Sequence, residues 1–323
     1  MLQSLPSWPL FGLADDVRPA LRRAAARGEP IALATITDLS GGGPRPVGTQ
    51  MSFAASEVCG FLSGGCLEAD LAGHARQALE TGAPRRLVYG EGSPWPDIRL
   101  LCGARIEILL ERLSPDDEAL SALLGKTAAR IPALWISDGG RRDCVAADSS
   151  VSPWPGAFCR RFDPVPRLIV VGSDPTALAI ASLGTQAGFE THLIRPKGPA
   201  EPPPNIDGIA YGRDEPAVAL ARIGLDRWTA VAVASHDPHI DQAALAAALP
   251  TPAFYVGALG ARRRLEDRMG GLRSAGVADH DLSRLHAPIG LDIGGKAPWE
   301  VAISVLAEIT AERHRLAALA AAK

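Results

Sequence analysis

The residues with the clearest chemical potential lie at 58–79, where Cys66 directly follows Gly64 and Gly65. Residues 58–62 are typical of a short strand, and apolar residues recur at helical spacing after the glycines. We therefore expect a strand, a glycine turn and a helix, with Cys66 in the first helical turn. Unpaired N–H groups and the helix dipole at that position favour a thiolate.

The residues beside Cys66 suggest a ligand site. Gly64 and Gly65 have no Cβ, so a ligand could approach the backbone closely. Glu68 is a carboxylate suited to a helix start, but it could also take a proton from that ligand. The alternative interpretation is that Cys66 is a small buried apolar residue after an ordinary turn.

A second thiol, Cys102, repeats the arrangement because it lies beside Gly103. Soft thiolates favour zinc, copper(I), an iron–sulfur cluster or a soft metal centre carried by a cofactor. The short C-x₂₋₄-C spacing of zinc sites is absent. A zinc site built from Cys66, Cys102, His74 and Cys59 is disfavoured, because His74 lies eight residues along the helix from Cys66.

A glycine-rich loop with the sequence SGGGPRPVG spans residues 40–48 and cannot continue the preceding strand. Arg45 lies between two prolines and could bind a phosphate with two parallel hydrogen bonds, although a solvated arginine is the alternative. Residues 49–54 and 58–62 are predicted to pair as a hairpin. The glycine-rich loop and the Cys66 turn would then lie at the ends of neighbouring strands.

Composition limits the class of protein. The 323 residues are 47% hydrophobic and 21% charged, which is typical of a soluble globular protein with two domains. A net charge of −3 gives no reason to expect nucleic acid or an anionic membrane as a partner. Five scattered cysteines and the lack of a signal-like segment indicate reduced thiols and a cytoplasmic protein.

The second half alternates strands and helices. Residues 167–172 form a continuous apolar strand, and the further strands are predicted at 190–194, 229–235 and 253–259. This rhythm indicates a Rossmann-like fold. The predicted fold class is α/β, a mixed α/β N-terminal domain followed by a Rossmann-like, doubly wound parallel-sheet domain. The predicted boundaries are 1–150 for the first domain, 151–166 for a linker and 167–323 for the second domain. The C-terminal helix, from Trp299 to about Arg315, carries an apolar side with Val301, Val305, Leu306 and Ile309. We expect this side to pack on the first domain or on a second copy of the chain.

The nucleotide signal of this half is weak. The fingerprint G-x-G-x-x-G has Asp174 in place of its second glycine, and Arg195 stands where an acidic residue would bind the ribose of NAD. NADP remains possible, since Arg195 could bind its 2′-phosphate. His236 and Asp237 follow the fourth strand at its carboxyl end, where such sheets bind ligands, and a polar cap of the strand end is the alternative.

Several motifs together resemble the XdhC/CoxI family, the accessory proteins that mature molybdenum hydroxylases such as xanthine dehydrogenase. These motifs cover most of the chain: PRP at 44–46, SGGCLE at 63–68, CG at 102–103, SHD at 235–237, YVGALG at 255–260, and PIGLDIG at 288–294 leading into PWEVAISVLAEI. The chain departs from the family pattern at Ala104, Asp174 and Arg195.

The resemblance implies a chaperone that binds the molybdenum cofactor, holds it during sulfuration and delivers it to an apoenzyme such as xanthine dehydrogenase. It also implies a cysteine desulfurase as a partner and a homodimer, and it indicates an accessory protein more than a catalyst, with no catalytic residues. Cys66 and Cys102 would bind the metal. The full predicted cofactor site is Cys66, Cys102, Gly64, Gly65, Glu68, Arg45, Gly103, His236 and Asp237. The alternatives are an NADP-dependent oxidoreductase and an interaction scaffold.

Overall fold

A computed structural model describes residues 5–43, 45–65, 67–93, 103 and 105–321. The chain divides into two compact units, Met1–Pro164 and Val165–Lys323. Each unit has two clusters of buried apolar side chains of its own. The units are therefore described separately.

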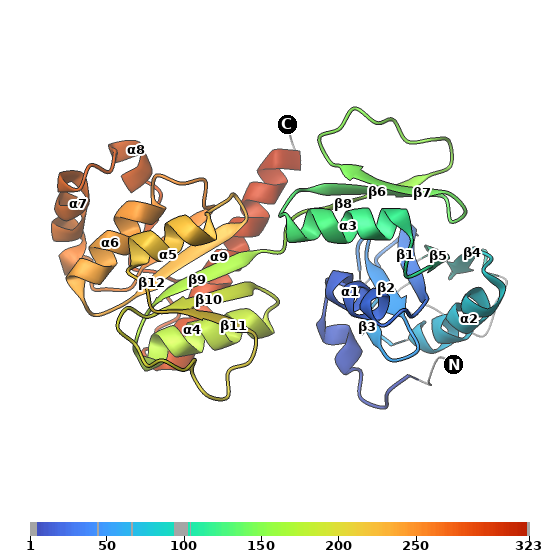
Figure 1. Ribbon diagram of the computed structural model, residues 1–323, viewed down its shortest axis with the longest axis horizontal. Coiled ribbons are helices and arrows are strands. Elements are labelled where there is room, and N and C mark those ends of the chain that lie inside the picture. The colour runs from blue at the N-terminus through green and yellow to red at the C-terminus, as the bar shows by residue number, and fades with distance from the viewer. Residues whose placement is uncertain (1–4, 44, 66, 94–102, 104, 322–323) are drawn as a thin grey trace. The chain divides into compact units, whose positions relative to one another are not determined.

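The first unit contains two antiparallel sheets (Figure 1). The larger has the strand order β3-β2-β1-β5-β4, and the smaller has the order β7-β6-β8. The elements in chain order are η1 Leu10–Leu13, α1 Arg18–Ala26, β1 Ile31–Ser40, β2 Gln50–Phe53, β3 Val58–Gly60, α2 Glu68–Thr81, β4 Arg85–Tyr89, β5 Arg105–Leu113, α3 Glu118–Ala128, β6 Ala133–Ser137, β7 Arg142–Ala146 and β8 Phe158–Phe162. The predicted hairpin is confirmed, because Met51 of β2 pairs with Gly60 of β3.

The two faces of the five-stranded sheet are covered by different elements. Helix α2 buries Leu71 and Ala75 in the cluster on one face. On the other face, Leu21 of α1 and Leu120 of α3 pack with Trp135 of the smaller sheet. Strand side chains alternate between the two faces, so the single strand β1 contributes to both clusters. This arrangement fixes the positions at which the loops leave the sheet.

The segment 151–166, predicted as a linker, contains the strand β8, and the chain divides after Pro164. Trp135 of β6 pairs with Arg160 of β8 in antiparallel register, and Phe162 is buried in the same cluster as Trp135. The prolines in this segment suggested a linker, but they flank the strand and leave its N–H groups free for the ladder.

The second unit is a parallel six-stranded sheet with helices on both faces (Figure 1). Its strand order is β11-β10-β9-β12-β13-β14, the doubly wound order of Rossmann folds, so the predicted fold class is confirmed. The elements are β9 Arg167–Gly172, α4 Pro175–Gln186, β10 Glu190–Ile194, β11 Ile209–Gly212, α5 Pro216–Ile223, β12 Thr229–Ala234, α6 Pro238–Ala248, β13 Tyr255–Ala258, η2 Arg262–Arg264, α7 Leu265–Ser274, α8 Asp279–Leu282, β14 Leu285–His286 and α9 Pro298–Ala321.

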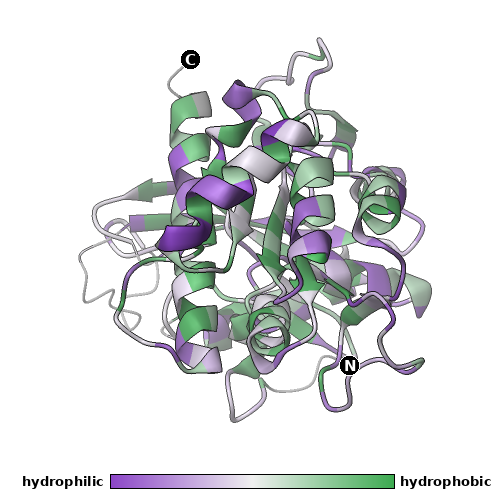
Figure 2. Cartoon of the chain, turned by 90° about the vertical axis from the view of Figure 1, so that its left-hand side faces the viewer, coloured by the Kyte–Doolittle hydropathy of each residue, from purple (hydrophilic) through white to green (hydrophobic). Residues whose placement is uncertain are grey.

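The central strands of this sheet are buried on both faces. Leu168 and Val170 of β9 pack in the cluster with α4 and α9, whereas Ile169 and Val171 pack in the cluster with α5 and α6. Figure 2, which turns this unit toward the viewer, shows hydrophobic strands behind the helices, and these helices carry hydrophilic residues on the side that faces the viewer. The continuous apolar run of β9 is thus explained by burial from two sides.

Helix α9 covers its own sheet. The helix carries an apolar side that includes Val305 and Ile309, and the sequence led us to expect this side on the first domain or on a second copy of the chain. Both side chains are instead fully buried against α4 and the parallel sheet of the same unit. The apolar side of α9 therefore gives no support to a dimer. None of the helices formed by the described residues is long and apolar enough to cross a membrane.

Candidate functional site

One edge of the five-stranded sheet gathers most of the predicted site residues. Ser40 at the end of β1 pairs with Arg105 at the start of β5, and β2 begins and β3 ends at the same edge. The Arg45 loop, the turn with Gly64 and Gly65, and the segment that contains Gly103 all leave the sheet there. We call this the loop edge, defined by the described residues 41–43, 45–49, 61–65, Leu67 and Gly103. The structure thus brings together loops that lie far apart in the sequence.

Glu68, the first residue of α2, organises the glycine turn of the loop edge. Its Oε1 accepts hydrogen bonds from the backbone N–H groups of Leu62 (3.0 Å) and Ser63 (2.8 Å). Its Oε2 accepts from the Ser63 hydroxyl at 2.7 Å, from the Gly65 N–H at 3.0 Å and from the Leu67 N–H at 3.2 Å. The carboxylate therefore binds five donors of the turn while only 2% of the residue is exposed.

This geometry changes the role expected for Glu68. Both oxygens are occupied by donors of the turn itself, so the carboxylate holds the turn in shape rather than facing a ligand as a proton acceptor. The Ser63 hydroxyl reinforces it by accepting from the Leu67 N–H at 2.9 Å. Spacing in the sequence placed Glu68 near the turn correctly, but it could not show that the side chain points inward.

Gly64 and Gly65 leave the backbone of the turn open. Their φ angles are +91° and +100°, in the left-handed region that favours glycine. An added Cβ at either position would meet no heavy atom within 4 Å, so the space beside the turn is free. A polar or anionic group of a ligand could therefore lie directly against this backbone.

Two arginines lie close to the glycine-rich loop. Arg45 pairs with Asp15, while its buried Nε makes no hydrogen bond to any described residue. Arg160 of β8 stacks its guanidinium 4.3 Å from the Phe162 ring, and its buried Nη1 also has no partner among the described residues. An added Cβ at Gly48 would lie 4.0 Å from the Arg160 Cγ, so Arg160 borders the loop. Arg45 thus brings a guanidinium group to the loop edge, and the side chain of Arg160 lies beside it.

Burial shifts the pKa of Arg160. Removal from water lowers the pKa of its guanidinium to about 10, although Asp16 counteracts the shift. The lack of a hydrogen bond partner for Nη1 among the described residues is a further cost of this burial. The sequence analysis missed Arg160, because its strand lies in the segment interpreted as a linker. The sequence FCRRF at 158–162 does not alternate apolar and polar residues, so it carries no clear strand signal.

The predicted metal ligands Cys66 and Cys102 lie outside the described residues, so their proposed role stays a prediction. Among the residues that are described, no group of three His, Cys, Asp or Glu side chains is placed to hold a metal ion. Cys59 packs in the cluster with α1, and His74 belongs to α2, which covers the opposite face of the sheet. The disfavoured zinc site could therefore not combine Cys59 with His74.

In the second unit, Asp174 and Asp237 cap helices. The Asp174 side chain accepts from the Ala177 N–H at 2.8 Å at the start of α4, and Asp237 accepts from the His239 N–H at 2.8 Å at the start of α6. His236 Nε2 lies 3.0 Å from Asp174 Oδ2, in the crevice between the carboxyl ends of β9 and β12. A carboxylate therefore occupies the helix terminus where a dinucleotide would place its pyrophosphate, and an NADP site there gains no support.

Three of the quoted motifs meet at Glu308 of α9. Its carboxylate accepts from the Tyr255 hydroxyl and from the Gly290 N–H (2.7 Å), and it lies 3.2 Å from His286 Nδ1. The Tyr255 and His286 rings stack with their centroids 4.4 Å apart. Burial is the main cause that raises the pKa of Tyr255, so its hydroxyl stays a donor. The YVGALG, PIGLDIG and PWEVAISVLAEI motifs therefore share a structural role, because they join the β13 end of the sheet to helix α9.

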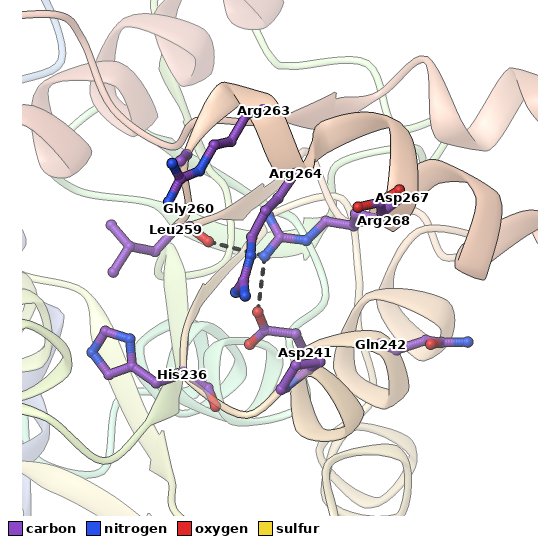
Figure 3. Close-up of a pocket in the computed structure, with 12 residues that line it drawn as sticks. His236, Asp241, Gln242, Leu259, Gly260, Arg263, Arg264, Asp267 and Arg268 are labelled. Atoms are coloured by element: carbon purple, nitrogen blue, oxygen red, sulfur yellow. Dashed lines mark hydrogen bonds and ion pairs between the residues drawn. The ribbon is translucent and has the colours of Figure 1, made fainter.

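A pocket opens at the carboxyl ends of β12 and β13 (Figure 3). Arg268 Nη2 binds Asp241 Oδ2 at 2.9 Å and the Leu259 carbonyl at 3.0 Å. Burial raises the pKa of the Asp241 carboxyl to about 6, although Arg268 counteracts the shift. The predicted residue His236 also lines this pocket. The sequence analysis missed Arg268 and Asp241, although the arginine run 262–264 directly after a strand end was a usable signal.

Comparisons with known proteins assign the chain to a family. Residues 168–309 match the family model described as the XdhC Rossmann domain, and residues 24–90 match the model of the XdhC and CoxI family. The chain belongs to the XdhC and CoxI family, which confirms the resemblance inferred from the motifs. Its relatives include the molybdenum cofactor insertion chaperone PaoD of Escherichia coli (strain K12), which is 33% identical over 307 residues and aligned over 93% of this chain and 90% of PaoD.

Two further comparisons agree. A protein of Bacillus subtilis (strain 168) that is named as a probable xanthine dehydrogenase component is 25% identical, with 90% of this chain and 95% of that protein aligned. A crystal structure described as a xanthine dehydrogenase from Bacillus halodurans superposes with a TM-score of 0.73 over 92% of this chain and 96% of that chain. At 23% sequence identity, this likeness shows that the two proteins share a fold.

Proposed function

We propose that the protein is a chaperone that binds the molybdenum cofactor at the loop edge and inserts it into a molybdenum hydroxylase. The similarity to PaoD, named as a molybdenum cofactor insertion chaperone, along almost the whole chain supports this proposal. The observation that carries it is the convergence of the Arg45 loop, the open Gly64-Gly65 turn and Gly103 at one edge of one sheet.

The chemistry of this edge fits the cofactor as cargo. The cofactor has a phosphate end, which suits the guanidinium donors of Arg45 and Arg160 and the open glycine backbone. Its other end is a soft molybdenum–dithiolene centre, for which the thiols of Cys66 and Cys102 are suitable ligands. Glu68 would keep the turn in the shape that exposes its backbone.

The finer steps belong to the same proposal. The protein would hold the cofactor while a terminal oxo ligand is exchanged for sulfur, with a cysteine desulfurase as the sulfur donor and apo xanthine dehydrogenase or a related enzyme as the acceptor. We further propose a cytoplasmic homodimer. Light scattering at micromolar concentration tests the assembly, and a strictly monomeric protein would contradict it.

The binding step is tested by mixing the purified protein with molybdenum cofactor, removing free ligand and measuring retained molybdenum and pterin. We expect stoichiometric retention by the wild type and loss of at least nine-tenths of it in the double variant Cys66→Ala/Cys102→Ala. Cys144→Ala is the matched control, because Cys144 is buried in the cluster with α3, which contains no residue of the loop edge. Equal retention by the double variant and the wild type would refute a thiol site.

A further inference from the structure

The pocket at the carboxyl ends of β12 and β13 is lined only by residues of the second unit, whereas the loop edge belongs to the first. We call it the arginine pocket, and it is lined by Ser235, His236, Pro238, Asp241, Gln242, Leu259, Gly260, Ala261, Arg263, Arg264, Asp267 and Arg268. Its volume of about 520 Å³ falls in the range of small-molecule sites. Its position at strand carboxyl ends is where open α/β sheets bind ligands.

The arginines of the arginine pocket differ in whether their guanidinium groups have partners among the described residues. Arg268 is held by Asp241 and the Leu259 carbonyl. Arg263 and Arg264 are exposed, and their side chains make no hydrogen bond or ion pair within the part of the chain that the structure describes. Figure 3 shows these two arginines and His236 around the pocket. Two guanidinium groups that line one pocket are suited to a phosphate, because each can bind phosphate oxygens with charge-assisted hydrogen bonds.

Asp241 adds a second requirement. Its side chain is only 9% exposed, and its Oδ1 has no hydrogen bond partner among the described residues, whereas Oδ2 binds Arg268. A buried carboxylate oxygen needs a donor, so a ligand with an N–H or O–H group would satisfy it. Inorganic phosphate has an O–H group of its own near neutral pH, but its whole negative charge would lie close to that oxygen. A ligand that separates its anionic end from a neutral hydrogen bond donor fits the pocket better.

We infer that the arginine pocket binds a nucleoside phosphate, with the phosphate on Arg263 and Arg264 and a ribose hydroxyl or base N–H donating to Asp241 Oδ1. Leu259 and Pro238 supply apolar surface for the sugar and base. The helix terminus capped by Asp174 follows a different strand, so the inferred site is distinct from the one that the dinucleotide fingerprint would define. The inference does not depend on cofactor binding at the loop edge.

Isothermal titration of the full-length protein with AMP, GMP, CMP and UMP tests the inference, with adenosine and inorganic phosphate as partial ligands. We expect at least one nucleotide to bind at least tenfold more tightly than either partial ligand. The variant Arg263→Ala/Arg264→Ala should weaken that binding at least tenfold, since each charge-assisted hydrogen bond contributes about one order of magnitude. Asp241→Asn should weaken it as well, with circular dichroism used to check that the variant is folded.

The control variant is Arg213→Ala/Arg222→Ala, which removes two exposed arginines of the same unit that do not line the pocket. The control should keep wild-type affinity. Loss of binding in Arg263→Ala/Arg264→Ala would then be due to the lost contacts in the pocket and not to the lower net charge of the protein. The inference is overturned if no nucleotide binds at about 1 mM, if inorganic phosphate binds as tightly as the best nucleotide, or if Arg263→Ala/Arg264→Ala retains full affinity.

Discussion

Replacing Glu68 by glutamine should destabilise the glycine turn of the loop edge. The change keeps the shape of the side chain but turns one carboxylate oxygen into an NH₂ group. If the NH₂ group takes the position of Oε2, it faces the hydroxyl of Ser63 and the N–H groups of Gly65 and Leu67. All three of these groups are placed as donors. The variant would therefore set donors against donors inside the turn.

The size of the effect follows from which donors keep another acceptor. Gly65 is exposed and its N–H can be hydrated, and the buried N–H of Leu67 keeps its hydrogen bond to the Ser63 Oγ. The hydroxyl of Ser63, a residue that is only 8% exposed, then loses its hydrogen bond to a charged acceptor without replacement, at about 1.5–3 kcal/mol. We expect Glu68→Gln to lower the free energy of unfolding of the first unit by about 2 kcal/mol.

Urea unfolding of the full chain, followed by hydrogen exchange of peptides from residues 62–71, measures this loss and assigns it to the turn. Glu80→Gln is the matched control, because Glu80 lies on the exposed side of the same helix, and its effect should stay within about 0.5 kcal/mol. A loss below about 1 kcal/mol in Glu68→Gln, or equal losses in both variants, would show that the five contacts do not hold the turn.

Three further predictions concern single residues. The folded state raises the pKa of Asp241 from 3.8 to about 6, so the free energy of unfolding of the wild type should fall by up to ~3 kcal/mol as pH rises from about 4 to 7, relative to that of Asp241→Asn. Urea titrations measure this fall, and parallel pH profiles of the two proteins would contradict it. Burial raises the pKa values of Cys59 and Cys144 to about 11, so at about pH 8 alkylation, mapped by mass spectrometry, should be at least two orders of magnitude slower in the native protein than in urea. Gly257→Ala would place a Cβ 2.7 Å from an isoleucine side chain and should cost about 1–3 kcal/mol in thermal unfolding, whereas Gly270→Ala meets nothing within 4 Å and should not destabilise.

The sequence predicted the second unit well because hydrophobic periodicity is a local signal. The strand 167–172 was predicted with the bounds that the structure shows for β9, since an apolar run buried from both sides leaves no polar position inside it. The strands β11 and β14 were not predicted. β14 has only two residues, and both strands lie at edges of the sheet, where pairing with one neighbour imposes little pattern on the sequence.

The candidate site was predicted less completely, because side-chain direction depends on contacts between distant residues. The sequence placed Glu68 beside the glycine turn, but its inward orientation depends on donors from Leu62 to Leu67 that fold around it. Arg160 was missed because it reaches the glycine-rich loop only through the pairing of β8 with β6. Asp241 looked like an ordinary residue of a helix, and only the tertiary structure shows that one of its oxygens has no partner among the described residues.

The position of α9 sets an order for folding during synthesis. This helix follows all six strands of the parallel sheet in the chain, yet Val305 and Ile309 cover the face formed by Leu168 and Val170 of the first strand. The opposite face can be covered earlier, because α5 and α6 emerge from the ribosome before the last strands do. The part of this face that α4 leaves uncovered therefore stays exposed until α9 has been made, and the second unit completes its native core only then.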